Sequence, residues 1–291
     1  MDQMRLTPEQ LTDPAAFAPQ APPAAAEAQA YAEKAVAATR EEAQAGFTPV
    51  RVSYGVDPAQ RLDVYAQESE KRPVLLFFHG GAWIAGFPYW TGFMARAASQ
   101  NGAMLVAATY RLAPAQRFPA QLDDATAALD WVRENIARYG GDPQRIIVGG
   151  HSAGGHLAAL VALTAHRPGV VGCFPVSAPL DIRYGDCAPG SPEERVYKFL
   201  LARREDDEGA SPIVHAARAR VPFHVMYGER DMPRISEANE RFAETMRKAD
   251  KPLTLHRMAG ASHFDTHLAL RDPQAPWYQA LRRCNAQEEN P

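Results

Sequence analysis

Short apolar runs alternate with segments of helical composition along the chain, and this alternation restricts the fold more than any other feature. Most of the later runs are separated by helical stretches, such as 94–100, 123–139, 156–164 and 237–249. Strands that alternate with helices form a mostly parallel sheet with helices on both faces. No helix separates the first two runs, so we expect an antiparallel edge there. The eight predicted strands, rich in β-branched and aromatic residues, are 50–52, 62–65, 74–78, 104–109, 145–148, 170–175, 223–227 and 253–257.

A serine lies at the centre of the pentapeptide Gly150-His151-Ser152-Ala153-Gly154. The apolar run 146–148 precedes it and the helical stretch 156–164 follows it. A strand-turn-helix unit of this kind is typical of a nucleophile elbow, whose tight turn needs small neighbours and lifts the hydroxyl clear of the sheet. The pattern predicts that Ser152 is the nucleophile of a serine hydrolase.

An activated serine needs a base, and His263 is the best placed of the nine histidines. It follows the last predicted strand through a turn-prone segment, at the sheet edge where the elbow is expected. His267 lies four residues further on in a predicted helix, so we interpret it as an ordinary side chain. His79 and His151 lie inside glycine motifs, and we expect His79 to brace its loop.

The acid that orients the base is expected after the preceding strand, 223–227. That position offers Asp231 and Glu229. We favour Asp231, because the turn needs a residue or two to leave the strand, and we keep Glu229 as the alternative. A carboxylate is needed there to hold the imidazole in the tautomer that accepts the serine proton.

Glycines after the strand 74–78 predict donors for an oxyanion. Gly80 and Gly81 allow the backbone to approach a substrate, and the N–H of Ala153, next after the nucleophile, supplies another donor. An aromatic group follows this loop and fits either a substrate pocket or the core. Its members are Trp83, Phe87, Tyr89 and Trp90.

Several motifs together resemble the hormone-sensitive-lipase-type carboxylesterases of the α/β-hydrolase family. They are Phe-His-Gly-Gly-Ala-Trp at 78–83, Tyr-Arg-Leu-Ala-Pro at 110–114, Phe-Pro-Ala at 118–120 with two aspartates at 123–124, and Gly-His-Ser-Ala-Gly-Gly at 150–155. The resemblance spans about 74–267. It implies an α/β-hydrolase fold that cleaves small carboxylic esters through an acyl-enzyme. It also implies the site residues Ser152, Asp231, His263, Gly80, Gly81 and Ala153.

A narrower resemblance concerns the arylformamidase (kynurenine formamidase) branch, whose members hydrolyse the formamide of N-formylkynurenine. It rests on segments 54–55, 61–65, 210–212, 263–265 and 272–273, whereas segment 110–114 is closer to the esterases. An arylformamidase is therefore the alternative activity. An alternative of another class is a non-catalytic small-molecule-binding protein on the same fold.

The chain is expected to divide into a helical arm and one large domain. Residues 1–46 are rich in proline and then in alanine and glutamate, which predicts an N-terminal arm that contributes to a cap. The alternative for this segment is a partly disordered leader. Residues 47–291 then form the α/β-hydrolase domain. Segment 182–210 fits neither a helical nor a strand period and follows a core strand at the ligand-binding edge, so we expect a lid-like insert there.

Composition restricts the partners. A balance of 31 basic against 34 acidic residues, without a basic run, argues against nucleic acid, and no apolar stretch approaches the roughly 20 residues of a membrane span. Three widely spaced cysteines predict reduced thiols, with Cys173 buried in a strand. We expect a cytoplasmic protein that acts on a small ester or formamide without a metal or other cofactor. The sequence leaves open whether it is a homodimer.

Overall fold

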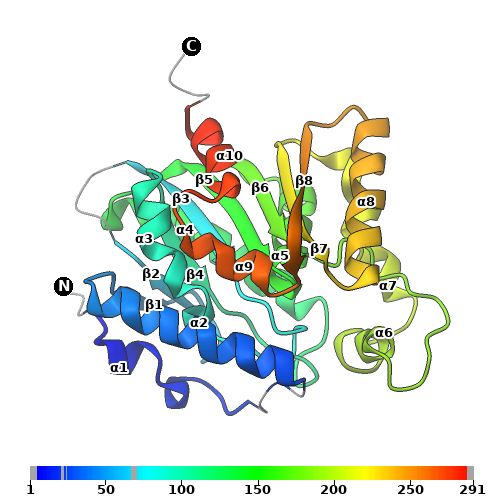
Figure 1. The fold of residues 1–291 in the computed structure, drawn as a ribbon, viewed down its shortest axis with the longest axis horizontal. Coiled ribbons are helices and arrows are strands. Elements are labelled where there is room, and N and C mark those ends of the chain that lie inside the picture. The colour runs from blue at the N-terminus through cyan, green and yellow to red at the C-terminus, as the bar shows by residue number, and fades with distance from the viewer. Residues whose placement is uncertain (1–4, 21–22, 24, 67–70, 287–291) are drawn as a thin grey trace.

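The computed structural model describes residues 5–20, 23, 25–66 and 71–286, and these residues form an α/β fold around one eight-stranded sheet (Figure 1). The strand order is β1-β2-β4-β3-β5-β6-β7-β8. β1 and β2 pair antiparallel, as do β2 and β4, and every other pair is parallel. The predicted antiparallel edge is therefore confirmed. The strands are β1 Val50–Ser53, β2 Arg61–Val64, β3 Arg72–Phe78, β4 Met104–Ala108, β5 Gly141–His151, β6 Val170–Val176, β7 Phe223–Arg230 and β8 Leu253–Ser262.

The central strand β3 shows why the apolar runs form this sheet. Its side chains alternate between two hydrophobic cores, with Val74, Leu76 and Phe78 in one core and Leu75 and Phe77 in the other. A strand that is buried on both faces reads as a continuous apolar run, which is the pattern of a parallel sheet covered by helices.

Helices cover both faces of the sheet (Figure 1). α4 Ala120–Asn135, α5 Ala153–Thr164 and α8 Pro233–Lys248 contribute buried residues to one core. α2 Ala26–Gln44, α3 Ala95–Gln100 and α10 Pro276–Ala286 contribute to the other. Within the described ranges, no helix combines the length and the apolar character that crossing a bilayer requires.

Shorter elements connect these layers. The segment between β6 and β7 holds α6 Pro192–Arg195, a π-helical turn Val196–Leu200 and α7 Asp206–Gly209, and α6 lies at the lower right of Figure 1. The N–H of Phe118 donates to the carbonyl of Leu200 at 2.9 Å, which fastens this segment to the loop before α4. The other short helices are α1 Pro8–Leu11 and α9 Asp265–Leu268, with 3₁₀ turns at Pro14–Ala16, Pro88–Trp90, Gly92–Met94, Ile136–Tyr139, Pro212–Arg218 and Ala269–Arg271.

The N-terminal helix α2 packs on the sheet through the positions that helical spacing predicts. Tyr31, Ala35 and Ala38 are all buried. Before α2, the carbonyl of Leu11 accepts a hydrogen bond from Arg51, whose guanidinium also forms a buried ion pair with Asp63 at 2.6 Å. The segment that contains Leu11 is thereby tied to the antiparallel edge of the sheet. Cys173 is buried in β6, as predicted, and the three cysteines are free thiols.

Candidate active site

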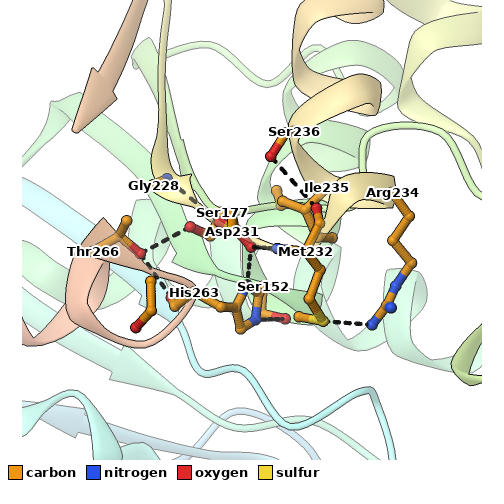
Figure 2. Close-up of polar contacts among 12 residues, drawn as sticks. Ser152, Ser177, Gly228, Asp231, Met232, Arg234, Ile235, Ser236, His263 and Thr266 are labelled. Carbon is orange, nitrogen blue, oxygen red and sulfur yellow. Dashed lines mark hydrogen bonds and ion pairs between the residues drawn. The ribbon is translucent and has the colours of Figure 1, made fainter. Parts of the chain in front are cut away.

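Three strands that lie next to one another, or one strand apart, end directly before the residues predicted to react. β5 ends at His151 and is followed by Ser152, β7 ends immediately before Asp231, and β8 ends immediately before His263. Because β5, β6, β7 and β8 are parallel, their carboxyl ends meet at one edge of the sheet. Figure 2 shows Ser152, Asp231 and His263 together at that edge.

Ser152 has the backbone of a tight elbow, with φ 52° and ψ −121°. Its N–H donates to the carbonyl of Val176 at 2.8 Å, and its own carbonyl accepts from the N–H of His156 at 3.0 Å as α5 begins. A Cβ at Gly154 would overlap the carbonyl of Phe78, and one at Gly150 would overlap the backbone of Gly154. The glycines are therefore required by the close approach of three chain segments.

The three side chains form a continuous hydrogen-bonded relay. His263 Nε2 lies 3.0 Å from Ser152 Oγ, and His263 Nδ1 lies 2.8 Å from Asp231 Oδ1. An ionised carboxylate only accepts, so the proton of the neutral imidazole lies on Nδ1. Nε2 then faces the serine hydroxyl with a lone pair that can take its proton. His263 and Asp231 are 7% and 8% exposed, so little water competes for these bonds.

The environment of Asp231 keeps it ionised. Burial acts to raise its pKa, but the hydrogen bond and the charge of His263, together with the hydrogen bond from the Met232 N–H, outweigh burial and hold the pKa below the ordinary value. The alternative acid, Glu229, lies apart from the relay. It is exposed and binds Arg257 at 3.1 Å and the Gly260 N–H at 2.9 Å. The structure thus brings Asp231, and not Glu229, to His263.

Two hydroxyl groups behind the relay were not predicted from the sequence. Ser177 directly follows β6, and its Oγ lies 2.8 Å from Thr266 Oγ1. Thr266 Oγ1 in turn donates to the carbonyl of His263 at 2.8 Å (Figure 2). A polar residue immediately after a buried strand of the same sheet edge is the signal that points to Ser177.

The loop after β3 lies against the nucleophile. A Cβ at Gly80 would lie 3.3 Å from Ser152 Cβ, so the Gly80 backbone borders the serine side chain. His79 braces the loop: its Nδ1–H donates to the Gly80 carbonyl at 2.7 Å, and its Nε2 accepts from Thr109 Oγ1 at 3.0 Å. Burial lowers the pKa of His79 to about 4, so this ring is neutral. The predicted bracing role of His79 is confirmed.

The two remaining candidate donors also lie near Ser152 in the chain or on this loop. Gly81 has φ 121°, and its carbonyl accepts from the N–H of Ile84 at 3.0 Å and of Ala85 at 3.1 Å, which closes a tight turn. Ala153 is the first residue of α5. A first-turn N–H has no partner within its helix and lies at the positive end of the helix dipole, so it suits a negative oxygen.

The four aromatic residues after this loop are divided between the two cores. Trp83 is buried with α4 and α5, and its ring meets that of His156 edge-on at 5.0 Å. Tyr89 and Trp90 belong to the core under α2 on the other face. Phe87 is half-buried and stacks on Tyr89 at 4.8 Å. The four rings therefore do not form one group, and Tyr89 and Trp90 serve as packing for the N-terminal helix.

Among the residues that the structure describes, no three histidine, cysteine or carboxylate side chains gather as ligands of an ion.

The chain is similar to one described protein family and to a known esterase. The profile of a family described as alpha/beta hydrolase fold matches residues 75–266, well over half of the chain. Esterase LipC of Mycobacterium tuberculosis is 35% identical over 237 residues, which cover 73% of this chain and 59% of LipC. The chain therefore spans about three fifths of the length of that relative.

Solved structures of two esterases superpose on this chain. An esterase of Pyrobaculum calidifontis superposes with a TM-score of 0.66 and 25% identity, covering 77% of this chain and 78% of the other. The thermostable carboxylesterase EstE1, cloned from a metagenomic library, superposes with a TM-score of 0.65 and 26% identity, covering 77% and 84%. Both matches cover about three quarters of this chain.

Proposed function

We propose that this chain, which belongs to the α/β-hydrolase fold family, hydrolyses small carboxylic esters through an acyl-enzyme. The observation that carries the proposal is the relay in which His263 bonds Ser152 Oγ at 3.0 Å and Asp231 at 2.8 Å. This arrangement supplies a nucleophile, a base and an orienting acid at one sheet edge.

In the first half of the reaction, Ser152 Oγ attacks the carbonyl carbon of the ester while its proton moves to His263 Nε2. Asp231 stabilises the imidazolium that forms and holds its Nδ1–H. The tetrahedral intermediate then collapses, the proton passes from Nε2 to the leaving alkoxide, and the acyl group stays on Ser152. In the second half, water replaces the alcohol and the same proton transfers release the carboxylic acid.

We assign the N–H groups of Gly80, Gly81 and Ala153 to the negative oxygen of the intermediate. The proposal is supported by the contact of Gly80 with Ser152 and by the position of Ala153 at the start of α5. Each such donor lowers the barrier by about 3 to 4 kcal/mol in other hydrolases. This chemistry uses only groups of the chain and water, without a metal or organic cofactor.

The arrangement of Ser152, His263 and Asp231 suits attack on the carbonyl carbon of a formamide as well as on that of an ester, so an arylformamidase is the second candidate. It is favoured by the segments at 54–55, 61–65 and 263–265, whereas the relatives named above are esterases. The ratio of kcat/KM for short p-nitrophenyl esters to that for N-formylkynurenine decides between them. A ratio that strongly favours the formamide would replace our first choice.

We further propose that the described part of the N-terminal arm 1–46 and the insert at about 182–210 border the substrate site, and that the insert acts as a lid. Residues 1–4, 21–22 and 24 of the arm lie outside the described residues. Phe87, which is half-buried, and Trp83, which is buried but lies on the same loop as Gly80 and Gly81, are our candidates for the pocket wall. The three free thiols fit a reducing, cytoplasmic setting. A measurement of molecular mass in solution would show whether two copies of the chain associate.

The first test is Ser152→Ala. We expect it to lower p-nitrophenyl acetate hydrolysis by about three orders of magnitude or more, because the variant has no nucleophile. Ser53→Ala is the matched control, since Ser53 is an exposed serine at the end of β1. Unfolding temperatures of both variants should stay near that of the wild type. Retained hydrolysis by a folded Ser152→Ala protein would contradict the proposal.

A further inference from the structure

Two adjacent residues of the elbow contact the residue that acts as base. Ser152 Oγ lies 3.0 Å from His263 Nε2, and His151 Nε2 lies 2.9 Å from the backbone carbonyl oxygen of His263. A carbonyl oxygen only accepts, so the proton of His151 lies on Nε2 and Nδ1 carries the lone pair. The elbow is thus joined to the histidine loop once through the reacting atoms and once through a contact that takes no part in the chemistry.

The ring of His151 is fixed on several sides. It is 1% exposed, and its Nδ1 faces the oxyanion loop, where a Cβ at Gly80 would lie 2.9 Å away. The ring centroid lies 4.8 Å from that of His263 and 4.8 Å from that of His267, which is nearly parallel to it. His267 Nδ1 bonds the hydroxyl of Tyr31 at 2.8 Å. Packing of this kind leaves one orientation for the Nε2–H donor.

The charge of His151 does not change when His263 is protonated. Burial, and then the positive charge of His263, lower the pKa of His151 to about 3. The ring therefore remains neutral and keeps its Nε2–H while the base gains and loses a proton.

The two contacts behave differently once the serine is acylated. Ser152 Oγ is then bonded to the acyl carbon and has no proton to donate to His263 Nε2. Asp231 still orients the imidazole, but Asp231 lies in the turn after β7 and not in the elbow. Thr266 also donates to the His263 carbonyl, but Thr266 belongs to the same loop as His263. Among the contacts of the described residues, the bond from His151 is the one that still joins the elbow to the backbone of the base.

We propose that His151 is a positioning residue that holds the His263 loop against the elbow during deacylation. The inference rests on the proposed acyl-enzyme. In that step a water oxygen attacks the acyl carbon and its proton passes to His263 Nε2. The C–Oγ bond then breaks, and the same proton passes to Ser152 Oγ as the carboxylic acid leaves. The base must face the water at a fixed distance from the acyl carbon, although its bond to the serine is absent.

The test compares three changes at position 151. His151→Leu removes the donor at similar volume, and His151→Asn keeps an amide that reaches only as far as Nδ1. His151→Gln places an amide N–H at about the reach of Nε2. The substrate is p-nitrophenyl acetate, whose good leaving group makes acylation fast, so that kcat reports deacylation and kcat/KM reports acylation.

We expect kcat of His151→Leu and His151→Asn to fall about 10- to 100-fold, the scale of a misplaced catalytic group, while kcat/KM falls much less. KM then falls with kcat, and a larger fraction of enzyme is trapped as acyl-enzyme in rapid-quench mass spectrometry. His151→Gln should restore most of kcat. If the His151→Leu variant does not fold, the comparison of His151→Asn with His151→Gln tests the same point.

His156→Leu is the matched control. His156 is also fully buried and neutral, and its Nε2 bonds a backbone carbonyl, that of Ala210, at 2.7 Å. Its loss should lower the unfolding temperature but leave the ratio of kcat to kcat/KM unchanged. Any of three results would overturn the inference. They are equal losses of kcat and kcat/KM in His151→Leu and His151→Asn, a kcat of His151→Gln that does not recover, and a change in the ratio of kcat to kcat/KM in His156→Leu as large as that in His151→Leu. Failure of the proposed function itself is distinct, because the wild type would then form no acyl-enzyme.

Discussion

Replacement of Asp231 by asparagine tests the relay at its acid, whose side chain is fully buried. In the wild type, Asp231 Oδ1 accepts from His263 Nδ1–H at 2.8 Å and from the Met232 N–H at 2.8 Å. Asparagine has nearly the same shape but one acceptor oxygen and no charge. The variant therefore preserves packing and removes only what the carboxylate does for the imidazole.

Two consequences follow for the rate. First, the imidazolium that forms in the transition state loses an ionised partner; at a charge separation of about 4 Å and an effective dielectric constant of about 20, that attraction is about 4 kcal/mol. At about 1.4 kcal/mol per factor of ten, this corresponds to about a thousandfold loss of rate. Second, an asparagine NH₂ turned toward Nδ1 would force the imidazole proton onto Nε2, which then has no lone pair for Ser152. Together the expected loss in kcat is about 10³- to 10⁴-fold.

The assay is kcat on p-nitrophenyl acetate at neutral pH, with circular dichroism to verify folding. Glu229→Gln is the matched control, because Glu229 is a nearby carboxylate that bonds Arg257 and the Gly260 N–H instead of His263. Its rate should stay within about twofold, as expected for an exposed ion pair. A larger loss for Glu229→Gln than for Asp231→Asn, or a folded Asp231→Asn enzyme with a tenth of the normal rate, would refute the assignment of the acid.

Two further predictions concern the same edge of the sheet. Gly80→Ala should lower kcat by about 10²- to 10³-fold, because its Cβ would lie 2.9 Å from His151 Nδ1 and displace the loop that carries the proposed oxyanion donors. Gly209→Ala is the control and should leave kcat unchanged, because a Cβ there meets nothing within 4 Å. Equal kcat values for the two variants would argue against the assignment of this loop. The lowered pKa of Asp231 means that its ionised form favours the folded state, so its contribution is present above the ordinary carboxyl pKa of about 4 and is lost as the pH falls through the folded-state value. Urea unfolding of the wild type and Asp231→Asn should therefore show a stability difference that narrows between pH 6 and pH 3; a constant difference would contradict this.

The strands were predictable from sequence because most of them are buried on both faces, as β3 is. The prediction was less accurate at strand ends. β5 begins at Gly141 rather than at residue 145, and β8 continues to Ser262 rather than ending at residue 257. Those extra residues pair with their neighbours through backbone bonds, as Gly141 does with Arg72 and Ser262 with Arg230. Backbone pairing leaves no apolar signature, so side-chain patterns do not reveal it.

The candidate site was predictable to the extent that topology dictates it. Ser152, Asp231 and His263 each follow a strand end, and parallel strands bring such positions together. Contacts between loops were not predictable in this way. Ser177 and Thr266 are 89 residues apart, and His151 and His263 are 112 apart. Such pairs depend on the direction in which each side chain leaves its loop, which residue spacing does not determine.

The strained backbone of Ser152 explains why the reacting atom can change its bonds without disturbing the fold. A non-glycine residue at φ 52° costs about 1 to 3 kcal/mol and persists only where its surroundings compensate. The compensating bonds run from the Ser152 N–H to the Val176 carbonyl and from the His156 N–H to the Ser152 carbonyl. Neither bond uses the hydroxyl. Acylation of Oγ, or its removal in Ser152→Ala, therefore leaves the supports of the elbow in place, and an alanine variant that lost much stability would show that the hydroxyl itself holds the turn.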